Sequence, residues 1–228
     1  MILQIISNIF IIAMMISSGI FTVNMPVQET FEKEISLKNN QAVMLELKFA
    51  ENINIKTWDK QKLYIKAVVE HNFKEKLDFQ LFEYNETNEL KIEEKIKNLE
   101  NRKNTYTRTS LNDTNCIRLN IEYEVYLPAN VKLAINSISG NIDVKNMNNT
   151  LTLETISGFV DVSLNAKGGY GFKCSTITGA IYSDLKFDKD AYPKQDIVGS
   201  KLNTSLNGGG KSIKLKSISG NLFIRKRK

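Results

Sequence analysis

The chain of 228 residues is poor in the side chains that metal and thiol chemistry require. It contains one histidine, His71, and two cysteines, Cys116 and Cys174. Structural zinc sites take four Cys or His ligands at short spacings, and multi-histidine sites need a second His. The composition therefore excludes both kinds of metal site. No catalytic motif occurs either, so we predict no catalytic, metal-binding or cofactor-binding residue, no cofactor and no enzymatic activity.

A large charge of either sign is also lacking. The 31 Lys and Arg residues are scattered among 25 Asp and Glu residues, which leaves a formal net charge of +6. Such a balance favours weak attraction to anionic polymers or membrane surfaces, and it indicates no specific nucleic-acid binding. The one dense basic run, Arg225–Lys228, is interpreted as a solvated terminus.

No Lys or Arg precedes Lys33, although the first 23 residues are largely apolar. The unbroken run Ile9–Ile16 is followed by the small residues Ser17, Ser18 and Gly19, as in a secretory signal peptide without its positive n-region. The alternatives are a buried N-terminal helix and an uncleaved membrane anchor, which would need roughly 20 apolar residues without interruption. We favour export to the periplasm, the cell surface or the medium, with residues 1–23 as signal peptide or anchor.

From Glu29 onward, apolar and polar residues alternate with the period of half-buried strands. The alternating segments cover residues 43–49, 53–55, 63–69, 77–81, 90–92 and 117–127. Pro128 ends the last and longest of them, because proline has no N–H for a ladder. The polar stretch Lys95–Asn115 predicts a long exposed loop. Residues 29–127 are therefore expected to form an N-terminal set of strands.

A four-residue phrase, Ser/Thr-Ile-Ser/Thr-Gly, follows and occurs four times. Its copies are Ser137–Gly140, Thr155–Gly158, Thr176–Gly179 and Ser217–Gly220. Apolar residues match between the copies at four and two positions before the phrase and at two and four positions after its glycine; Ser183 is the polar exception. Matching apolar columns that recur at roughly 20 residues predict stacked rungs, each of which buries its face on its neighbours.

The spacing within a copy predicts where each residue of the phrase points. The Ile lies three residues beyond the apolar column that precedes it, so we expect a bulge or corner at the first Ser/Thr and a further core column made by the isoleucines. These are Ile138, Ile156, Ile177 and Ile218. The glycine suits a position where a side chain would collide with the next rung, or where φ is positive.

The fold class that follows is all-β: a right-handed β-helix-like solenoid with short irregular rungs, preceded by the N-terminal strands. We assign residues 128–228 to the rungs and residues 29–228 to a single domain. Residues 186–212 lengthen the last interval between copies and are either a degenerate rung or a long loop. The Gly208–Gly210 run inside them leads into a strand and is interpreted as a turn rather than a phosphate-binding loop.

The repeated units resemble the bacterial putative-adhesin family, secreted domains of unknown function with Ser-Gly-x-Ile-x-Val repeats. The residues that carry the resemblance are Ile53–Lys60, Leu127–Leu133, Ser139–Val144 and Ser219–Ile224, in that order. The resemblance covers about residues 29–228. It implies a β-helix-like solenoid in the cell envelope, and it implies no established activity.

Two sets of polar residues are candidates for a site. The stacked hydroxyl groups of the phrase would form either an outward array for ice or saccharide, or a ladder that joins the rungs, which we favour. Asp143 and Asp161 occupy the same place after successive phrases, and such paired carboxylates could serve glycoside hydrolysis or bind calcium. Because Tyr182 and Phe223 take that place in the other copies, we favour solvated residues of an outer face.

Aromatic residues form the remaining candidate surface. Trp58 with Tyr64, and Tyr106 with Arg102 and Arg108, could contact a sugar or a protein partner, although scattered exposed aromatics are also normal.

The last two predictions concern the rare residues. Cys116 and Cys174 could pair in an oxidising compartment, but Cys174 falls in a core column and is expected to be a buried free thiol. His71 lies at a predicted strand end and is expected to be exposed.

Together these features predict a non-enzymatic exported envelope protein. It would be an adhesin-like binding or structural module that acts by surface contact with an envelope protein or polysaccharide. Membrane contact would come only from an uncleaved N-terminal segment. The alternatives are a polysaccharide-acting β-helix enzyme and a regulatory or sensory envelope domain.

Overall fold

The structure, a computed structural model, describes residues 26–72, 76–97, 119–188, 194–195 and 199–227. The regular elements of these residues are all β-strands, which confirms the all-β prediction. None of the described residues forms a helix with the length and hydropathy needed to cross a bilayer. The strands are β1 (Val27–Ser36), β2 (Ala42–Glu46), β3 (Asn52–Trp58), β4 (Lys62–His71), β5 (Asp78–Asn85), β6 (Glu89–Lys97), β7 (Leu119–Pro128), β8 (Leu133–Asn136), β9 (Asn141–Lys145), β10 (Leu151–Glu154), β11 (Val160–Leu164), β12 (Tyr170–Thr176), β13 (Ile181–Ser183), β14 (Lys194–Gln195), β15 (Ser200–Leu206), β16 (Lys211–Ser217) and β17 (Leu222–Lys226).

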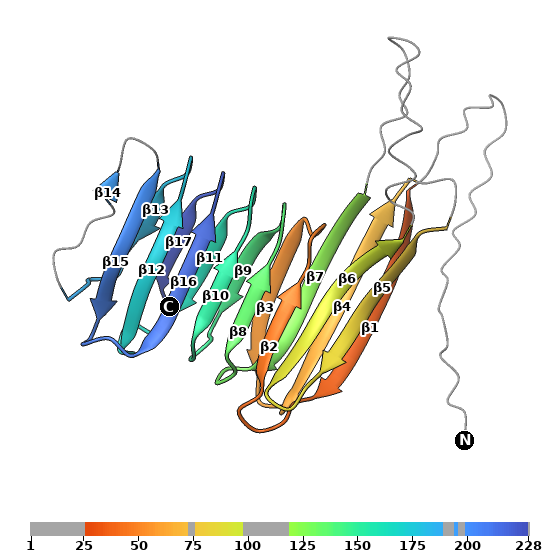
Figure 1. Cartoon of the computed structure of the whole chain (residues 1–228), viewed down its shortest axis with the longest axis horizontal. Coiled ribbons are helices and arrows are strands. Elements are labelled where there is room, and N and C mark those ends of the chain that lie inside the picture. The colour runs from red at the N-terminus through yellow and green to blue at the C-terminus, as the bar shows by residue number, and fades with distance from the viewer. Residues whose placement is uncertain (1–25, 73–75, 98–118, 189–193, 196–198, 228) are drawn as a thin grey trace, which may run out of the picture.

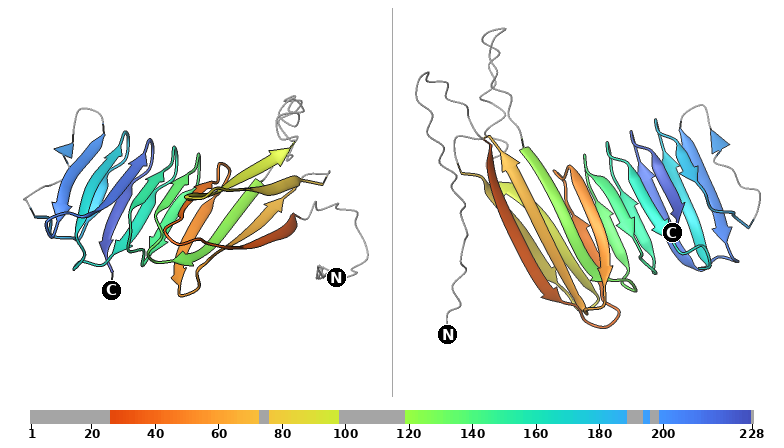
Figure 2. Two further views of the ribbon diagram at one scale, coloured as in Figure 1. Left: turned by 60° about the horizontal axis from the view of Figure 1, so that its bottom comes forward. Right: turned by 180° about the vertical axis from the view of Figure 1, so that it is seen from behind.

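Two sheets lie face to face along the whole length of the molecule (Figures 1 and 2). Sheet A has the strand order β1-β4-β7-β3-β9-β11-β17-β13, and sheet B has the order β14-β15-β12-β16-β10-β8-β2-β6-β5. The apolar residues of the alternating segments point inward from both sheets and form one continuous core. The polar residues between them point outward, so each sheet has an outer face open to solvent.

Five strand pairs pass from sheet B to sheet A through a sharp corner, and we call each pair a rung. In spatial order they are β2–β3, β8–β9, β10–β11, β16–β17 and β12–β13. Neighbouring rungs pair in parallel, as the repeats predict. The β2–β3 rung comes from the N-terminal strands, so both sheets run continuously through the two parts that the sequence separated. The boundary at residue 128 between the N-terminal strands and the rungs remains a prediction from the sequence.

The rungs do not stack in the order of the chain. The last rung, β16–β17, lies between β10–β11 and β12–β13 (Figure 1). After β11 the chain does not form the next rung in space but forms β12–β13, one position further away. It then returns through β15, which pairs antiparallel with β12, and β16–β17 takes the position between. Residues 186–212 are therefore neither a degenerate rung nor a plain loop, because they contain an antiparallel strand near the edge of sheet B.

The apolar columns of the aligned copies are confirmed by the register of the strands. Leu133, Leu151, Ile213 and Phe172 stand side by side in sheet B, and the columns that contain Ile135 and Ile142 are equally buried. Ser183 is exposed, as its polar character requires.

The prediction for the isoleucines of the phrase is wrong. Ile138, Ile156, Ile218 and Ile177 are 44, 44, 37 and 47% exposed, and the Ser/Thr that precedes each of them is buried instead. The strand thus continues inward through the first residue of the phrase, and the corner lies at the next two residues. Lys48 occupies the same corner place in the β2–β3 rung, where its carbonyl accepts a hydrogen bond from Ile138 N (3.3 Å).

The first hydroxyl of each phrase joins two rungs, as the ladder interpretation holds. Thr155 Oγ1 accepts a hydrogen bond from Gly158 N (3.3 Å) and donates one to Gly140 O (3.1 Å). Ser217, Thr176 and Ser137 make the same two kinds of bond at their own corners. A buried hydroxyl is stable only with such partners, so this column belongs to the fold and is not an outward array.

We expect Thr155→Val to lower the free energy of unfolding by about 1–3 kcal/mol, because it leaves two buried backbone groups without a partner. Ile156→Thr, one residue along, should change it by less than about 0.5 kcal/mol, since the side chain it replaces is half exposed. Urea unfolding followed by circular dichroism measures both. A larger loss from Ile156→Thr than from Thr155→Val would restore the core assignment of the isoleucines.

Smaller differences concern the N-terminal strands. Strand β6 continues to Lys97, so the expected loop does not begin at Lys95; residues 98–118 lie outside the described residues. Phe49, which the alternation placed inward, is 37% exposed because it stands at the corner of the β2–β3 rung. The turn expected at residues 85–88 is confirmed by the antiparallel pairing of β5 with β6.

Candidate functional site

The outer face of sheet A carries a cluster of three aromatic side chains near one end of the molecule. The ring centroids of Trp58 and Tyr126 are 5.6 Å apart, those of Trp58 and Tyr64 are 6.2 Å apart, and those of Tyr64 and Tyr126 are 6.1 Å apart. All three side chains are half-buried. We call them the tryptophan cluster.

Strand register builds this cluster from three segments of the chain. Tyr64 on β4 pairs directly with Tyr126 on β7, and Tyr126 pairs with Lys56 on β3. Trp58 ends β3 and donates a hydrogen bond from Nε1 to Lys62 O (2.9 Å), which fixes the indole at the connection between β3 and β4. The Nζ of Lys60 lies 4.8 Å from the centre of the Trp58 ring, so a cation borders the aromatic surface.

A second aromatic cluster, which we call the phenylalanine cluster, lies on the same face toward the other end. The rings of Tyr182 and Phe223 are stacked at 5.3 Å, and the Phe159 ring meets Phe223 edge-on at 6.2 Å. The guanidinium carbon of Arg225 lies 4.9 Å from the Phe223 ring centre. Tyr182 is 52% and Phe159 39% exposed, so the cluster presents aromatic surface to solvent.

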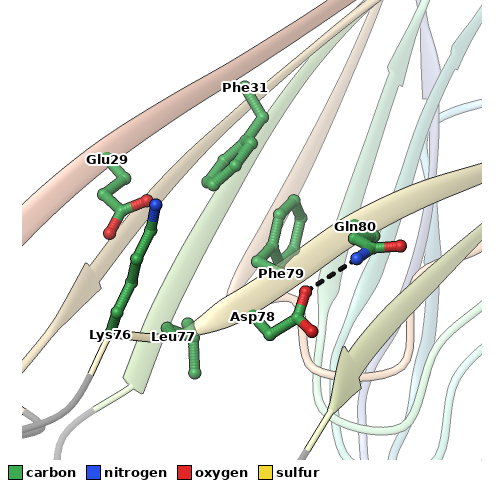
Figure 3. A pocket seen from close by; sticks show the side chains of 7 residues that line it. All are labelled: Glu29, Phe31, Lys76, Leu77, Asp78, Phe79 and Gln80. Atoms are coloured by element: carbon green, nitrogen blue, oxygen red, sulfur yellow. Dashed lines mark hydrogen bonds between the residues drawn. The ribbon is translucent and has the colours of Figure 1, made fainter.

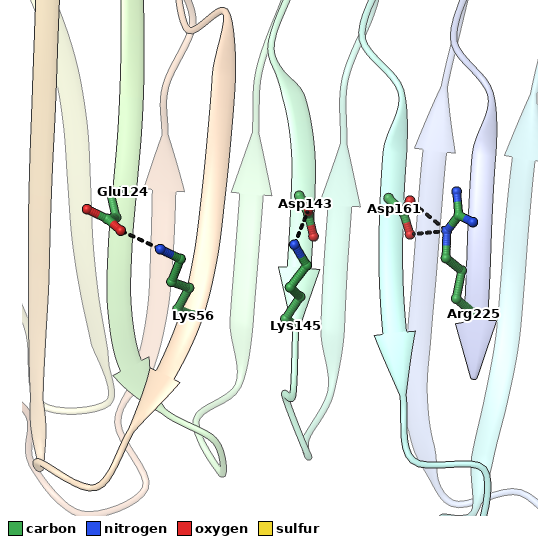
Figure 4. Close-up of polar contacts among 6 residues, drawn as sticks. All are labelled: Lys56, Glu124, Asp143, Lys145, Asp161 and Arg225. Atoms are coloured by element: carbon green, nitrogen blue, oxygen red, sulfur yellow. Dashed lines mark hydrogen bonds and ion pairs between the residues drawn. The ribbon is translucent and has the colours of Figure 1, made fainter. Parts of the chain in front are cut away.

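Ion pairs occupy the space between the two clusters (Figure 4). Lys56 Nζ lies 2.5 Å from Glu124, Lys145 Nζ lies 2.9 Å from Asp143, and Arg225 Nε lies 2.7 Å from Asp161. The hydrogen bond from Lys56 lowers the pKa of Glu124. Partial burial raises the pKa of Asp161, because the desolvation of its carboxylate outweighs the attraction of Arg225.

Asp143 and Asp161 stand directly opposite each other on β9 and β11, as the aligned copies predicted. Each carboxylate is held by its own cation. Such a pair suits an ordered surface better than glycoside hydrolysis, which needs one free nucleophile or base and one protonated acid. Within the described residues, no three His, Cys, Asp or Glu side chains are placed to hold a metal ion.

A shallow pocket opens where the two sheets separate, between the edge strands β1 and β5 (Figure 3). It encloses about 420 Å³ and is lined by Glu29, Phe31, Lys76, Leu77, Asp78, Phe79 and Gln80. The Phe31 and Phe79 rings meet across it at 4.6 Å. Asp78 accepts a hydrogen bond from Gln80 and lies 3.4 Å from Lys97. The pocket thus consists of core side chains under a rim of paired polar groups.

The other candidate residues have the following places. Cys174 is a buried free thiol, as expected, and burial raises its pKa to about 12. His71 is buried, contrary to expectation, because β4 extends to it and turns its side chain inward, where Nε2 lies 3.9 Å from Glu29. Cys116 and the expected group of Tyr106, Arg102 and Arg108 lie outside the described residues.

The structure confirms that Trp58 and Tyr64 lie together and adds Tyr126, which the sequence analysis missed. Tyr126 occupies an outward position of the longest alternating segment, where a polar residue is expected. An aromatic residue at such a position indicates a surface cluster. In the aligned copies, Tyr182 and Phe223 take the place of Asp143 and Asp161, which speaks against a carboxylate site that extends over all four copies. The register places all four in one row of the sheet, so the aromatic pair continues the acidic one.

Comparisons with known proteins bear on the fold. No protein-family model and no curated protein matches the chain. Among solved structures, it is similar to a putative cell adhesion protein from Clostridium sporogenes ATCC 15579, with a TM-score of 0.54 and 13% identity over 88% of this chain and 100% of that one. A putative adhesin from Bacteroides fragilis NCTC 9343 also matches, with a TM-score of 0.24 and 11% identity over 87% of this chain and 97% of that one. The likeness to the first protein extends over most of both chains and shows that the two share a fold.

Proposed function

We propose that the protein is an exported, non-enzymatic, adhesin-like module of the cell envelope that binds polysaccharide through the outer face of sheet A. The observation that carries the proposal is the presence of two aromatic clusters on the solvent side of one sheet. The core does not need these side chains, because outward positions of a half-solvated sheet are ordinarily polar. The aromatic rings therefore remain available for contact with a ligand.

The chemistry of this face suits a sugar polymer. Aromatic rings with a polar edge, such as those of Trp and Tyr, offer a flat apolar surface together with a hydrogen-bonding group. The paired carboxylates and cations between the clusters offer further donors and acceptors for hydroxyl groups. Four strand steps separate Tyr126 from Phe223, or about 19 Å at the usual strand spacing, so the face can accept several sugar units in a row.

The solenoid architecture and the export of the protein also belong to this proposal. We propose that the parallel rungs form a right-handed β-helix-like solenoid and that residues 1–23 direct export. The parallel register of the rungs supports the first proposal, although the rung order departs from the order of the chain. The apolar N-terminal run supports the second.

The test uses the only tryptophan of the chain as its probe. We expect soluble chitooligosaccharides or cellodextrins, which carry no repeating charge, to shift or quench the fluorescence of Trp58 in a saturable manner. The double variant Tyr64→Ser and Tyr126→Ser should weaken binding at least about tenfold, as loss of an aromatic contact does at binding surfaces. Thermal unfolding by circular dichroism verifies that the variant is folded.

A matched control lies on the other sheet. Tyr84 is 41% exposed on the outer face of sheet B, so Tyr84→Ser should leave the affinity unchanged. Equal losses in the control and in the double variant, or no response of Trp58 to any saccharide tested, would remove the proposed function.

A further inference from the structure

The outer face of sheet B carries a group of lysines near the end formed by β12 and β16, which we call the lysine face. Its members are Lys173, Lys214 and Lys216. Lys214 stands directly opposite Lys173 in the parallel register of β16 and β12. Like charges directly opposite each other destabilise a sheet, so this arrangement costs stability.

The fold does not require lysine at these positions. Along the row that contains Lys214 and Lys173, the other rungs place Met44, Ala134 and Thr152. Apolar, small and hydroxyl side chains are therefore all accepted there. Two lysines that a neutral residue could replace, and that oppose each other, indicate a selected function rather than a need of the sheet.

Few carboxylates lie on the lysine face to pair with its lysines. Among the outward positions of β10, β12, β15 and β16, Glu154 is the one carboxylate; its oxygens lie 2.5 Å from Lys214 Nζ and 3.9 Å from Lys216 Nζ. No carboxylate of the described residues lies within ion-pair distance of Lys173. On sheet A, by contrast, Lys56, Lys145 and Arg225 each have a carboxylate of their own.

We propose that the lysine face binds a linear polyanion, a polymer with a phosphate or a carboxylate on each repeating unit. Strand spacing places the lysines on a grid of about 5 Å across the strands and about 7 Å along them, so several can contact one extended chain. Thr152, Ser175 and Asn203 stand directly beside Lys214, Lys216 and Lys173, respectively, and supply uncharged hydrogen-bonding groups. No aromatic residue occupies an outward position of these four strands, so the stacking on which single-stranded nucleic acids depend is absent from this part of the chain.

The test measures binding of fluorescently labelled inorganic polyphosphate and of polygalacturonate by anisotropy, at salt concentrations from 50 to 300 mM. The double variant Lys173→Gln and Lys214→Gln should bind about 10–30-fold more weakly, as expected for about fivefold per lysine at an anionic surface. The slope of log affinity against log salt should become shallower by about two, one unit for each lost contact. Glu154→Gln should bind more tightly than the wild-type protein, because it removes the local counter-charge.

A control variant with the same change in net charge is Lys66→Gln with Lys145→Gln, on the outer face of sheet A. It should lose less than about threefold and keep the salt slope. Equal losses in the two double variants would show attraction by net charge alone and would overturn the proposal. So would failure of both polymers to bind at the lowest salt, or tighter binding of a single-stranded oligonucleotide than of polyphosphate.

The two proposals can fail separately. Trp58 lies on sheet A, so binding of polyphosphate to the lysine face should leave its fluorescence unchanged. The tyrosine double variant should likewise keep its affinity for polyphosphate. The ratio of affinities for polyphosphate and polygalacturonate identifies which anion the lysine face prefers.

Discussion

Replacement of Gly220 by alanine is expected to lower the free energy of unfolding by about 2–4 kcal/mol, whereas replacement of Gly171 should leave it unchanged or raise it by up to about 1 kcal/mol. The difference arises from the stacking of the corners. A Cβ atom on Gly220 would lie 1.8 Å from the carbonyl oxygen of Gly158, which is far inside van der Waals contact. A Cβ atom on Gly171 would meet nothing within 4 Å.

The neighbouring backbone cannot move away to relieve this collision. The Gly158 carbonyl accepts a hydrogen bond from Ser217 Oγ (3.0 Å), and the Gly220 carbonyl accepts one from Thr176 Oγ1 (2.8 Å). Rungs pack against Gly220 on both sides, because β16–β17 lies between two other rungs. Any shift of the Gly220 corner must therefore break ordered contacts in the neighbouring rungs.

Urea unfolding monitored by circular dichroism tests this expectation. Gly158→Ala and Gly179→Ala should behave like Gly220→Ala, since their added Cβ atoms would lie 2.0 and 2.1 Å from the next carbonyl oxygen. None of these three glycines has a positive φ, so close approach alone accounts for them. If Gly220→Ala and Gly171→Ala agreed within about 0.5 kcal/mol, the stacking of the corners would be wrong.

The glycine of each phrase and the apolar columns could be predicted from the sequence, because both recur at fixed positions within every copy. A side chain two residues along a strand returns to the same face, so Leu133 and Ile135 identify their partners in every copy. The isoleucines of the phrase were placed wrongly for a related reason. An apolar residue in every copy suggests a core column, but a corner interrupts the period, and no local pattern tells whether the corner precedes or follows the buried hydroxyl.

The order of the rungs was not predictable at all. Ile213 and Leu215 are matched by Leu151 and Leu153 on one side and by Phe172 and Cys174 on the other. Any of these pairs would satisfy hydrophobic burial, so the sequence pattern alone does not choose among stacking orders. The choice depends on how residues 186–212 return the chain, and this segment shares no period with the rungs.

The same limit applies to the candidate surfaces. Trp58 and Tyr64 are close in sequence and could be grouped for that reason, whereas Tyr126 joins them only through the pairing of β7 with β3 and β4. The phenylalanine cluster and the lysine face depend on the insertion of β16–β17 beside β12–β13, which brings Phe223 to Tyr182 and Lys214 to Lys173. Both surfaces are products of the rung order, and for that reason neither could be read from the linear sequence.

A buried carboxyl group should make stability depend on pH. Glu94 is 2% exposed and lies between the two sheets, where it accepts hydrogen bonds from Tyr123 Oη (2.6 Å) and Phe49 N (3.0 Å). Burial raises its pKa above the usual value of 4.5, because desolvation outweighs these two bonds and the attraction of Lys48. The folded state therefore holds its proton more tightly than the unfolded state.

The sign of the effect follows from this difference. Between the unfolded pKa of about 4.5 and the raised folded pKa, the folded state binds more protons, so the free energy of unfolding falls as the pH rises through that range. Glu94→Gln cannot titrate and should lack this loss. The difference in stability between Glu94→Gln and the wild-type protein should thus grow in favour of the variant from pH 4 to pH 8, and the contributions of other groups cancel in the difference.

Substitution of Tyr123, the hydrogen-bond partner of Glu94, is expected to have the larger effect on the free energy of unfolding. Tyr123→Phe removes the hydroxyl that holds the buried carboxylate, and we expect it to lower the free energy of unfolding by about 1–3 kcal/mol at pH 8, where the lost bond is to the charged form. At pH 4, where the carboxyl group is protonated, the loss should be smaller. Glu93→Gln, on the outward side of the same strand, should cost less than about 1 kcal/mol, as a surface ion pair does. A pH-independent loss in Tyr123→Phe, or a constant difference for Glu94→Gln, would show that the carboxyl group does not titrate inside the core.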